Sequence, residues 1–173
     1  MPELQSECHD IVEQTYRLND NVKDDVYRMI RDLGIDGKYA AIHVRTGDKV
    51  KETRLISPEI YMDELKMHTQ IKNVFVFTDE YDVFVSLKRE WKDYCFYTLT
   101  RPEEHGYNQS EIDEKDKDLS ARKNRMLFLF ACVELMKGAE VFVGTISSNP
   151  GMFMGMRCPD KVYYVDEPLW RIW

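Results

Sequence analysis

Several sequence motifs and segments that would assign a protein to a functional class are absent from this chain of 173 residues. None of the patterns GxxxxGKS/T, GxGxxG, HExxH or GxSxG occurs, which argues against P-loop NTPases, dinucleotide dehydrogenases, HExxH zinc peptidases and α/β-hydrolases. No apolar run approaches the roughly 18 residues of a membrane span. Residues 1–5 lack the basic-then-apolar layout of a signal peptide. We therefore expect a cytoplasmic protein, or a domain of a longer chain that would be lumenal in a secretory enzyme.

Cysteine is scarce and irregularly spaced. The four cysteines are Cys8, Cys95, Cys132 and Cys158, and none forms a CxxC pair. Cys95 and Cys132 lie within apolar runs, where a reduced cysteine behaves as a small hydrophobic residue. A zinc site is not expected from this pattern, and spacing alone leaves the disulfide state open.

Positive charge is also in the minority. Lys and Arg total 24 against 31 Asp and Glu, which gives a formal net charge of −7. This balance argues against a general binder of nucleic acid or of anionic membranes. Hydrophobic residues make up 43% of the chain and aromatic residues 12%, enough for one well-buried core. We expect a single domain over residues 1–173, with residues 1–20 as an N-terminal extension or helix.

Helical and strand patterns alternate along the chain. Residues 22–33 place apolar side chains at helical spacing, and Gly34 is a plausible C-cap. Further helices are expected at 57–69, 80–91 and 120–137, and a short one after 151, with a surface loop at 100–119. Strands are expected at 39–44, 74–77, 94–99, 141–143 and 162–165. The pattern predicts an α/β fold, a Rossmann-like three-layer domain with a mainly parallel sheet.

In such a sheet, ligands bind outside the carboxyl ends of the strands. That rule selects three loops, at residues 45–56, 78–81 and 144–151. These loops contain the chemistry on which a functional prediction depends.

The first loop gathers charged side chains. Arg45 and Lys49 follow a strand directly, His43 shares a face with Arg45, and Asp48 and Glu52 lie close in sequence. Arginine offers a planar fork for phosphate oxygens and lysine a point charge, so we interpret the loop as a phosphate site. The alternative is a surface cluster of salt bridges.

The other two loops are less specific. Ser147, Ser148 and Asn149 precede a helix, where hydroxyl groups and exposed N–H groups form an anion site or simply cap the helix. Asp79, after the second strand, is either a ligand residue or a helix cap. A basic loop and a serine-rich helix start on one edge together favour a diphosphate ligand.

Glu134 interrupts the apolar run FLFACVELM. Facing inward, its carboxylate would need donors such as the N1–H and N2–H₂ edge of a guanine. Facing outward, it would belong to the solvated side of an amphipathic helix. We predict the outward orientation.

Four segments in order resemble one family. They are AIHVRTGDKVKE, SPEIYM, VFVFTDE and AEVFVGTISSN. Together they are similar to the donor-binding half of the α1,6-fucosyltransferase, nodulation fucosyltransferase and protein O-fucosyltransferase superfamily, over residues 21–148. The resemblance implies one Rossmann-like half of a GT-B glycosyltransferase, GDP-fucose as donor, and transfer with inversion but without a metal or other cofactor. A glycan or protein would be the acceptor, and a further N-terminal domain or partner chain would complete the fold.

The resemblance also implies roles for the residues of the first loop. Arg45 would bind the β-phosphate of the donor, and His43 would lie against the diphosphate. Asp48 and Lys49 match the acid and lysine that follow in the family. Glu52 falls where the core-fucosylating enzymes carry a proposed base.

Five more residues are implied to bind substrate: Tyr61, which anchors the alignment, Asp79, Ser147, Ser148 and Asn149. The chain departs from the family where Thr46 replaces a second arginine and where Cys132 replaces the acid that reads guanine. We therefore expect a fucosyltransferase-like enzyme. The alternatives are a nucleotide-sugar-binding module without transfer activity and an interaction domain.

Overall fold

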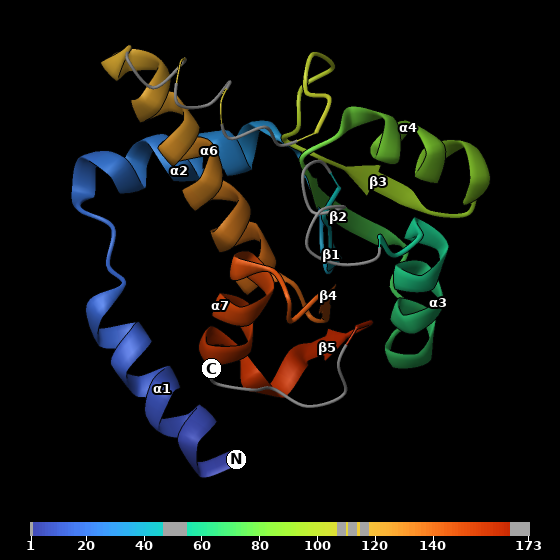
Figure 1. Ribbon diagram of the computed structural model, residues 1–173, viewed down its shortest axis with the longest axis horizontal. Helices are drawn as coiled ribbons and strands as arrows, with labels where there is room; N and C mark the ends of the chain where they lie inside the picture. The colour runs from blue at the N-terminus through green and yellow to red at the C-terminus, as the bar shows by residue number, and fades with distance from the viewer. Residues whose placement is uncertain (1, 47–54, 107–109, 111–113, 115–117, 167–173) are drawn as a thin grey trace.

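A computed structural model describes residues 2–46, 55–106, 110, 114 and 118–166. Its five strands are β1 (Ala40–Val44), β2 (Asn73–Thr78), β3 (Cys95–Tyr97), β4 (Phe142–Gly144) and β5 (Val162–Tyr164). They form one sheet in the order β3-β2-β1-β4-β5, and every neighbouring pair is parallel. Figure 1 shows this sheet between two groups of helices. The predicted α/β, Rossmann-like three-layer fold is confirmed.

The helices follow the predicted ranges closely. They are α1 (Pro2–Thr15), α2 (Asp20–Asp32), α3 (Pro58–His68), α4 (Tyr81–Glu90), α6 (Leu119–Gly138) and α7 (Asn149–Arg157), followed by the 3-10 turn η2 (Pro159–Lys161). One range was wrong in part, because Ser110 and Glu114 are helical within the predicted loop at 100–119. That stretch is mostly polar and charged, so its sequence shows no apolar periodicity from which a helix is predicted.

Local chemistry explains where helix α2 begins and ends. The Asn19 side chain accepts a hydrogen bond from the backbone N–H of Val22 at 3.0 Å, which satisfies one of the unpaired donors of the first turn. After the helix, Gly34 adopts a φ of 68°, a left-handed conformation that glycine takes without steric cost. The predicted C-cap glycine therefore closes this helix.

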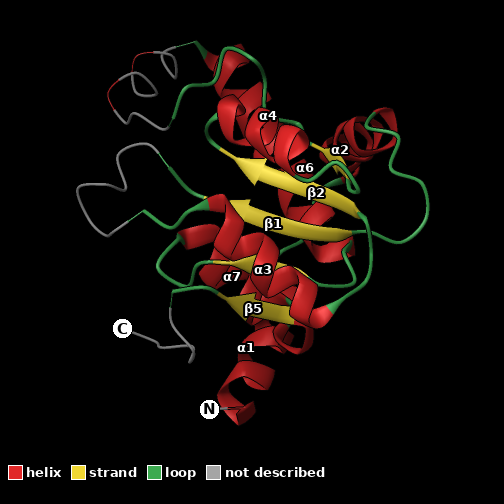
Figure 2. Ribbon diagram, turned by 90° about the vertical axis from the view of Figure 1, so that its right-hand side faces the viewer, coloured by secondary structure: helices red, strands yellow, loops and turns green. Residues whose placement is uncertain are grey.

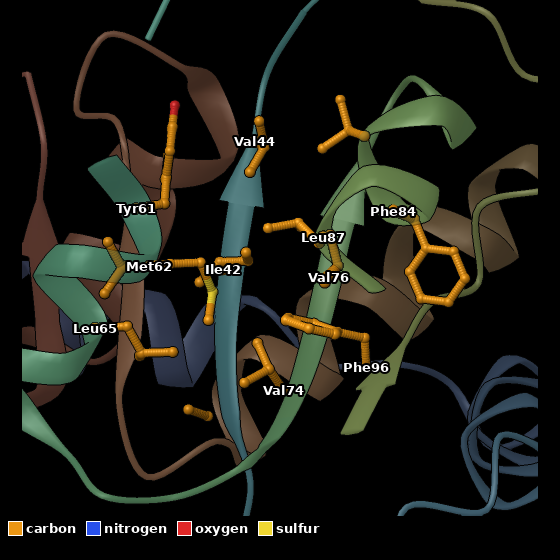
Figure 3. Packing of buried hydrophobic residues seen from close by; sticks show 13 residues of the cluster. Ile42, Val44, Tyr61, Met62, Leu65, Val74, Val76, Phe84, Leu87 and Phe96 are labelled. Carbon is orange, nitrogen blue, oxygen red and sulfur yellow. The ribbon is translucent and has the colours of Figure 1, made fainter. Parts of the chain in front are cut away.

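Two hydrophobic cores hold the layers together. On one face, side chains of α3 and α4 pack on β1, β2 and β3, as Figure 3 shows for Met62, Leu65 and Leu87. On the other face, α6 and α7 cover the sheet through residues such as Met136 and Met154, and α2 packs at their side. With both faces covered, the strands are nearly continuous apolar runs.

The sheet topology fixes where a ligand would bind. The chain runs outward from β1 through β2 to β3, then returns to place β4 on the other side of β1. The strand order therefore reverses between β1 and β4, and loops diverge there to leave a crevice in folds of this type. Figure 2 shows the arrowheads of β1 and β2 pointing to this same edge.

Among the described residues, no helix has both the length and the apolar character that a membrane span requires.

Candidate functional site at the carboxyl edge of the sheet

The described residues of the three predicted loops lie at one edge of the sheet, and the side chain of Asp79 joins the first two loops. Its carboxylate accepts hydrogen bonds from the Thr46 backbone N–H at 2.9 Å and from the Thr46 hydroxyl at 2.8 Å. Its second oxygen lies 3.4 Å from a terminal nitrogen of Arg45. Asp79 thus orients the start of the first loop instead of capping α4, whose N-cap residue is Glu80.

Among the described residues, Arg45 is a cation that lies at the switch point. It follows β1, the central strand, and its side chain is 22% exposed. This position lets a guanidinium contact both solvent and a ligand seated on the edge. Asp48, Lys49 and Glu52 lie outside the described residues, so their predicted roles remain predictions.

His43 lies beneath this edge and is buried, with 3% of its surface exposed. Its ring stacks on Phe77 with 4.7 Å between centroids, and its Nδ1 lies 3.4 Å from the hydroxyl oxygen of Ser148. Burial lowers its pKa from 6.5 to about 4, with Arg45 acting in the same direction and Asp79 against it. At neutral pH the ring is therefore uncharged and supports the loops by packing.

The neutral state of His43 predicts a pH-dependent stability. Because the pKa is lower in the folded protein than in the unfolded chain, the stabilisation is complete above pH 6.5 and is lost as the pH falls toward 4. We expect a loss of about 2–3 kcal/mol between pH 7.5 and 4.5 from this group. Urea unfolding of wild type and His43→Gln at both pH values measures it. Carboxylates contribute equally to both proteins, so identical losses would contradict the prediction.

Ser148 caps helix α7. Its hydroxyl donates to the carbonyl of Thr145 at 2.9 Å and accepts from the N–H of Gly151 at 3.2 Å. A Cβ at Gly151 would lie 1.9 Å from the Thr145 carbonyl oxygen, so only glycine fits at this position in the first turn of α7. For Ser148, the capping interpretation is confirmed, while exposed Asn149 begins the helix beside it.

A residue that the sequence analysis did not select occupies the loop after β4. The carboxylate of Asp166, just beyond β5, accepts hydrogen bonds from two consecutive backbone N–H groups, Ile146 at 2.8 Å and Ser147 at 3.0 Å. A signal was present, since Asp166 follows a predicted strand at the same edge. The predicted ligand loops were limited to those after the first, second and fourth strands, so the end of the fifth strand was missed.

Two buried hydroxyl groups lie next to these amides. The Thr145 hydroxyl is buried and makes no hydrogen bond of ordinary geometry among the described residues, although it lies near the Tyr61 hydroxyl. Tyr61, 1% exposed, extends along β1 toward the level of Val44 (Figure 3). Burial, reinforced by the Asp166 carboxylate, raises the pKa of Tyr61 well above its usual value. Tyr61 is thus positioned as a core support of the edge.

The predicted outward orientation of Glu134 is wrong. Glu134 faces inward, not outward, and its carboxylate pairs with the guanidinium of Arg157 at 2.8 Å. Arg157, 4% exposed, also contacts Glu13 of helix α1 at 3.1 Å and lies over the ring of Tyr16. The outward prediction was wrong because the cation that neutralises this carboxylate comes from α7, a different helix later in the chain.

Cys132, which the resemblance would align with a guanine-reading acid, is fully buried in the core under the sheet. Burial raises the pKa of its thiol well above the usual value. Among the described residues the cysteines are all unpaired, and no group of three or more His, Cys, Asp or Glu gathers to hold a metal ion. The metal-free reaction remains a prediction.

Comparison with known proteins adds no further likeness, since no protein-family model matches the chain and no curated protein matches it significantly. The resemblance to fucosyltransferases thus rests on the four quoted segments, and the fold is the conclusion that the structure establishes.

Proposed function

We propose that this chain binds a nucleotide diphosphate sugar, GDP-fucose or a close relative, at the carboxyl edge of its sheet and transfers the sugar to a glycan or protein hydroxyl. The observation that carries the proposal is the position of Arg45. It stands at the end of the central strand, oriented by Asp79, where the strand order reverses beside the start of α7. A diphosphate placed at a topological switch point meets such groups in other parallel α/β domains.

The chemistry of transfer explains why a cation is needed there. The acceptor oxygen forms a bond to the anomeric carbon as the bond from that carbon to the β-phosphate oxygen breaks. The electron pair leaves with the nucleotide diphosphate, so negative charge develops on the phosphate oxygens. Arg45, Lys49 and the Ser147–Ser148 helix start would stabilise this charge as oriented donors. Asp48 or Glu52 would accept the proton of the acceptor hydroxyl.

Recognition of the base needs a different account. Cys132 is buried in the core, and the carboxylate of Glu134 is engaged by Arg157. Neither side chain is therefore a suitable reader of a guanine edge at the switch point. We propose that selection among bases depends on other residues, so UDP- and ADP-sugars belong in every binding test.

The experiment incubates the full chain with radiolabelled GDP-fucose, with and without a glycan acceptor mixture, and follows released fucose, its anomeric configuration and labelled glycan. Labelled glycan, or hydrolysis with inverted configuration, is the expected result. Measurable affinity with neither reaction would select the nucleotide-sugar-binding module. Absence of affinity for any nucleotide sugar would overturn the proposal and leave an interaction domain.

A further inference from the structure

The Asp166 carboxylate sits on the pair of backbone donors that the proposed function assigns to phosphate. We propose that Asp166 is a built-in competitor for this pair: a phosphate oxygen of the ligand binds the N–H groups of Ile146 and Ser147 only after the carboxylate turns away. This inference rests on the proposed function and adds a residue that sets the affinity of the site.

The geometry is that of an occupied anion site. Two successive N–H groups point at one carboxylate, each meeting its own oxygen, at 2.8 Å and 3.0 Å. Consecutive backbone N–H groups before a helix hold anions because their partial positive charges add to that of the helix N-terminus. Helix α7, nine residues long, begins at Asn149 after its N-cap residue Ser148. A carboxylate and a phosphate present the same kind of acceptor oxygen to such a pair.

A second observation at the same place points to a ligand. The Thr145 hydroxyl, one residue before the amide pair, belongs to a residue that is 5% exposed and makes no hydrogen bond of ordinary geometry within the described part of the chain, although the Tyr61 hydroxyl lies near enough to interact with it. Buried hydroxyl groups are normally hydrogen-bonded. A phosphate carries three or four oxygens where a carboxylate carries two, so it can reach the amides and this hydroxyl together.

The Asp166 side chain can turn without moving the strand. The preceding backbone is fixed, because the N–H of Val165 donates to the Gly144 carbonyl at 3.0 Å. The Tyr164 hydroxyl donates to the Gly151 carbonyl at 3.1 Å and ties the end of β5 to α7. A change of side-chain rotamer at Asp166 therefore uncovers the amides while the loop keeps its shape.

Charge makes the competition unfavourable for a diphosphate. A carboxylate left near the amide pair repels phosphate oxygens within a few ångströms. Asp166 also raises the pKa of both Tyr61 and Tyr164, although burial is the larger cause for each. The negative charge of the Asp166 carboxylate therefore affects the groups around the amide pair. Removing the charge should free the pair and end the repulsion.

The test uses Asp166→Asn, which removes the charge but keeps an oxygen that accepts from the amides. Calorimetric titration with inorganic pyrophosphate and with GDP should show binding about tenfold tighter than for wild type, as expected if about a tenth of the wild-type molecules have the pair uncovered. Asp160→Asn is the matched control, since Asp160 is exposed on η2 and its replacement changes the net charge equally. Its affinity should equal that of wild type.

A second measurement uses wild-type protein alone and so avoids any folding defect of the variant. In ¹⁵N-labelled protein, pyrophosphate should shift the amide signals of Ile146 and Ser147. Wild-type binding of GDP without those shifts, or without tightening in a folded Asp166→Asn, would overturn the inference while the proposed function stands. If neither protein binds pyrophosphate or GDP, both proposals fail.

Discussion

Arg45→Ala is expected to lower turnover of the donor sugar by a factor of about 10²–10³. Removal of one oriented donor from developing oxyanion charge typically costs about 3 kcal/mol of transition-state stabilisation. Arg45 is the cation placed at the end of β1, where the β-phosphate charge would develop. Because the interaction strengthens as charge develops, kcat should fall more than the affinity for the intact donor.

Two controls separate this loss from a general disturbance. Arg45→Lys keeps the charge but loses the planar fork, so its turnover should lie between those of wild type and Arg45→Ala. Arg101→Ala removes an exposed cation from the loop after β3 and should leave turnover unchanged. Single-turnover kinetics with each folded variant make the measurement. Equal rates for Arg45→Ala and Arg101→Ala would exclude the proposed role of Arg45.

Glu134→Ala is expected to destabilise the fold by about 3 kcal/mol, since breaking a buried ion pair leaves an uncompensated charge. The remaining partner, Arg157, is 4% exposed and is embedded between helices α1, α6 and α7. Its contact with Glu13 persists, which places the expected loss at the lower end of the range for buried pairs. Urea unfolding at pH 7 gives the difference in free energy of unfolding.

The matched control is Glu140→Ala. Glu140 pairs with Lys38 at 3.4 Å, but both side chains are largely exposed, and such pairs contribute about 0–1 kcal/mol. A double variant, Glu134→Leu with Arg157→Met, should recover most of the stability, because apolar side chains of similar volume replace the buried charges. If the single and double variants are equally unstable, the loss comes from packing and the ion-pair account is wrong.

The fold was predictable because its signals are local. Apolar runs such as Val74–Phe77 and Val141–Val143 predict buried strands, and the Ser57–Pro58 pair predicts the start of a helix. Alternation of these elements with helices then selects a parallel sheet. The structure places strands and helices over nearly the same residues. The helical conformation of Ser110 and Glu114 was missed because the sequence there shows no apolar periodicity.

For the candidate site, the sequence predicted only which residues lie at the ends of strands. Arg45, Asp79 and Ser148 converge at one edge because parallel strands end together. What each side chain contacts there was not predictable. Asp79 binds the Thr46 backbone across 33 positions, and Asp166 binds Ser147 across 19, distances over which sequence spacing carries no information.

The orientation of buried charged residues was also not predictable from the sequence. Glu134 was predicted to face solvent because a lone carboxylate in an apolar run is costly to bury. Its partner, Arg157, lies on another helix, so the compensation exists only after folding. Sequence alone therefore reports the cost of such a residue and not the contact that offsets it.

Calorimetric titration with GDP, GDP-fucose, UDP and ADP tests the central claim most directly, with Arg45→Ala and Arg101→Ala alongside wild type. The account predicts saturable binding of at least the GDP-type ligands to wild type and Arg101→Ala, and clearly weaker binding to folded Arg45→Ala. The account would be contradicted if wild type bound none of the four ligands, or if Arg45→Ala bound them as tightly as wild type.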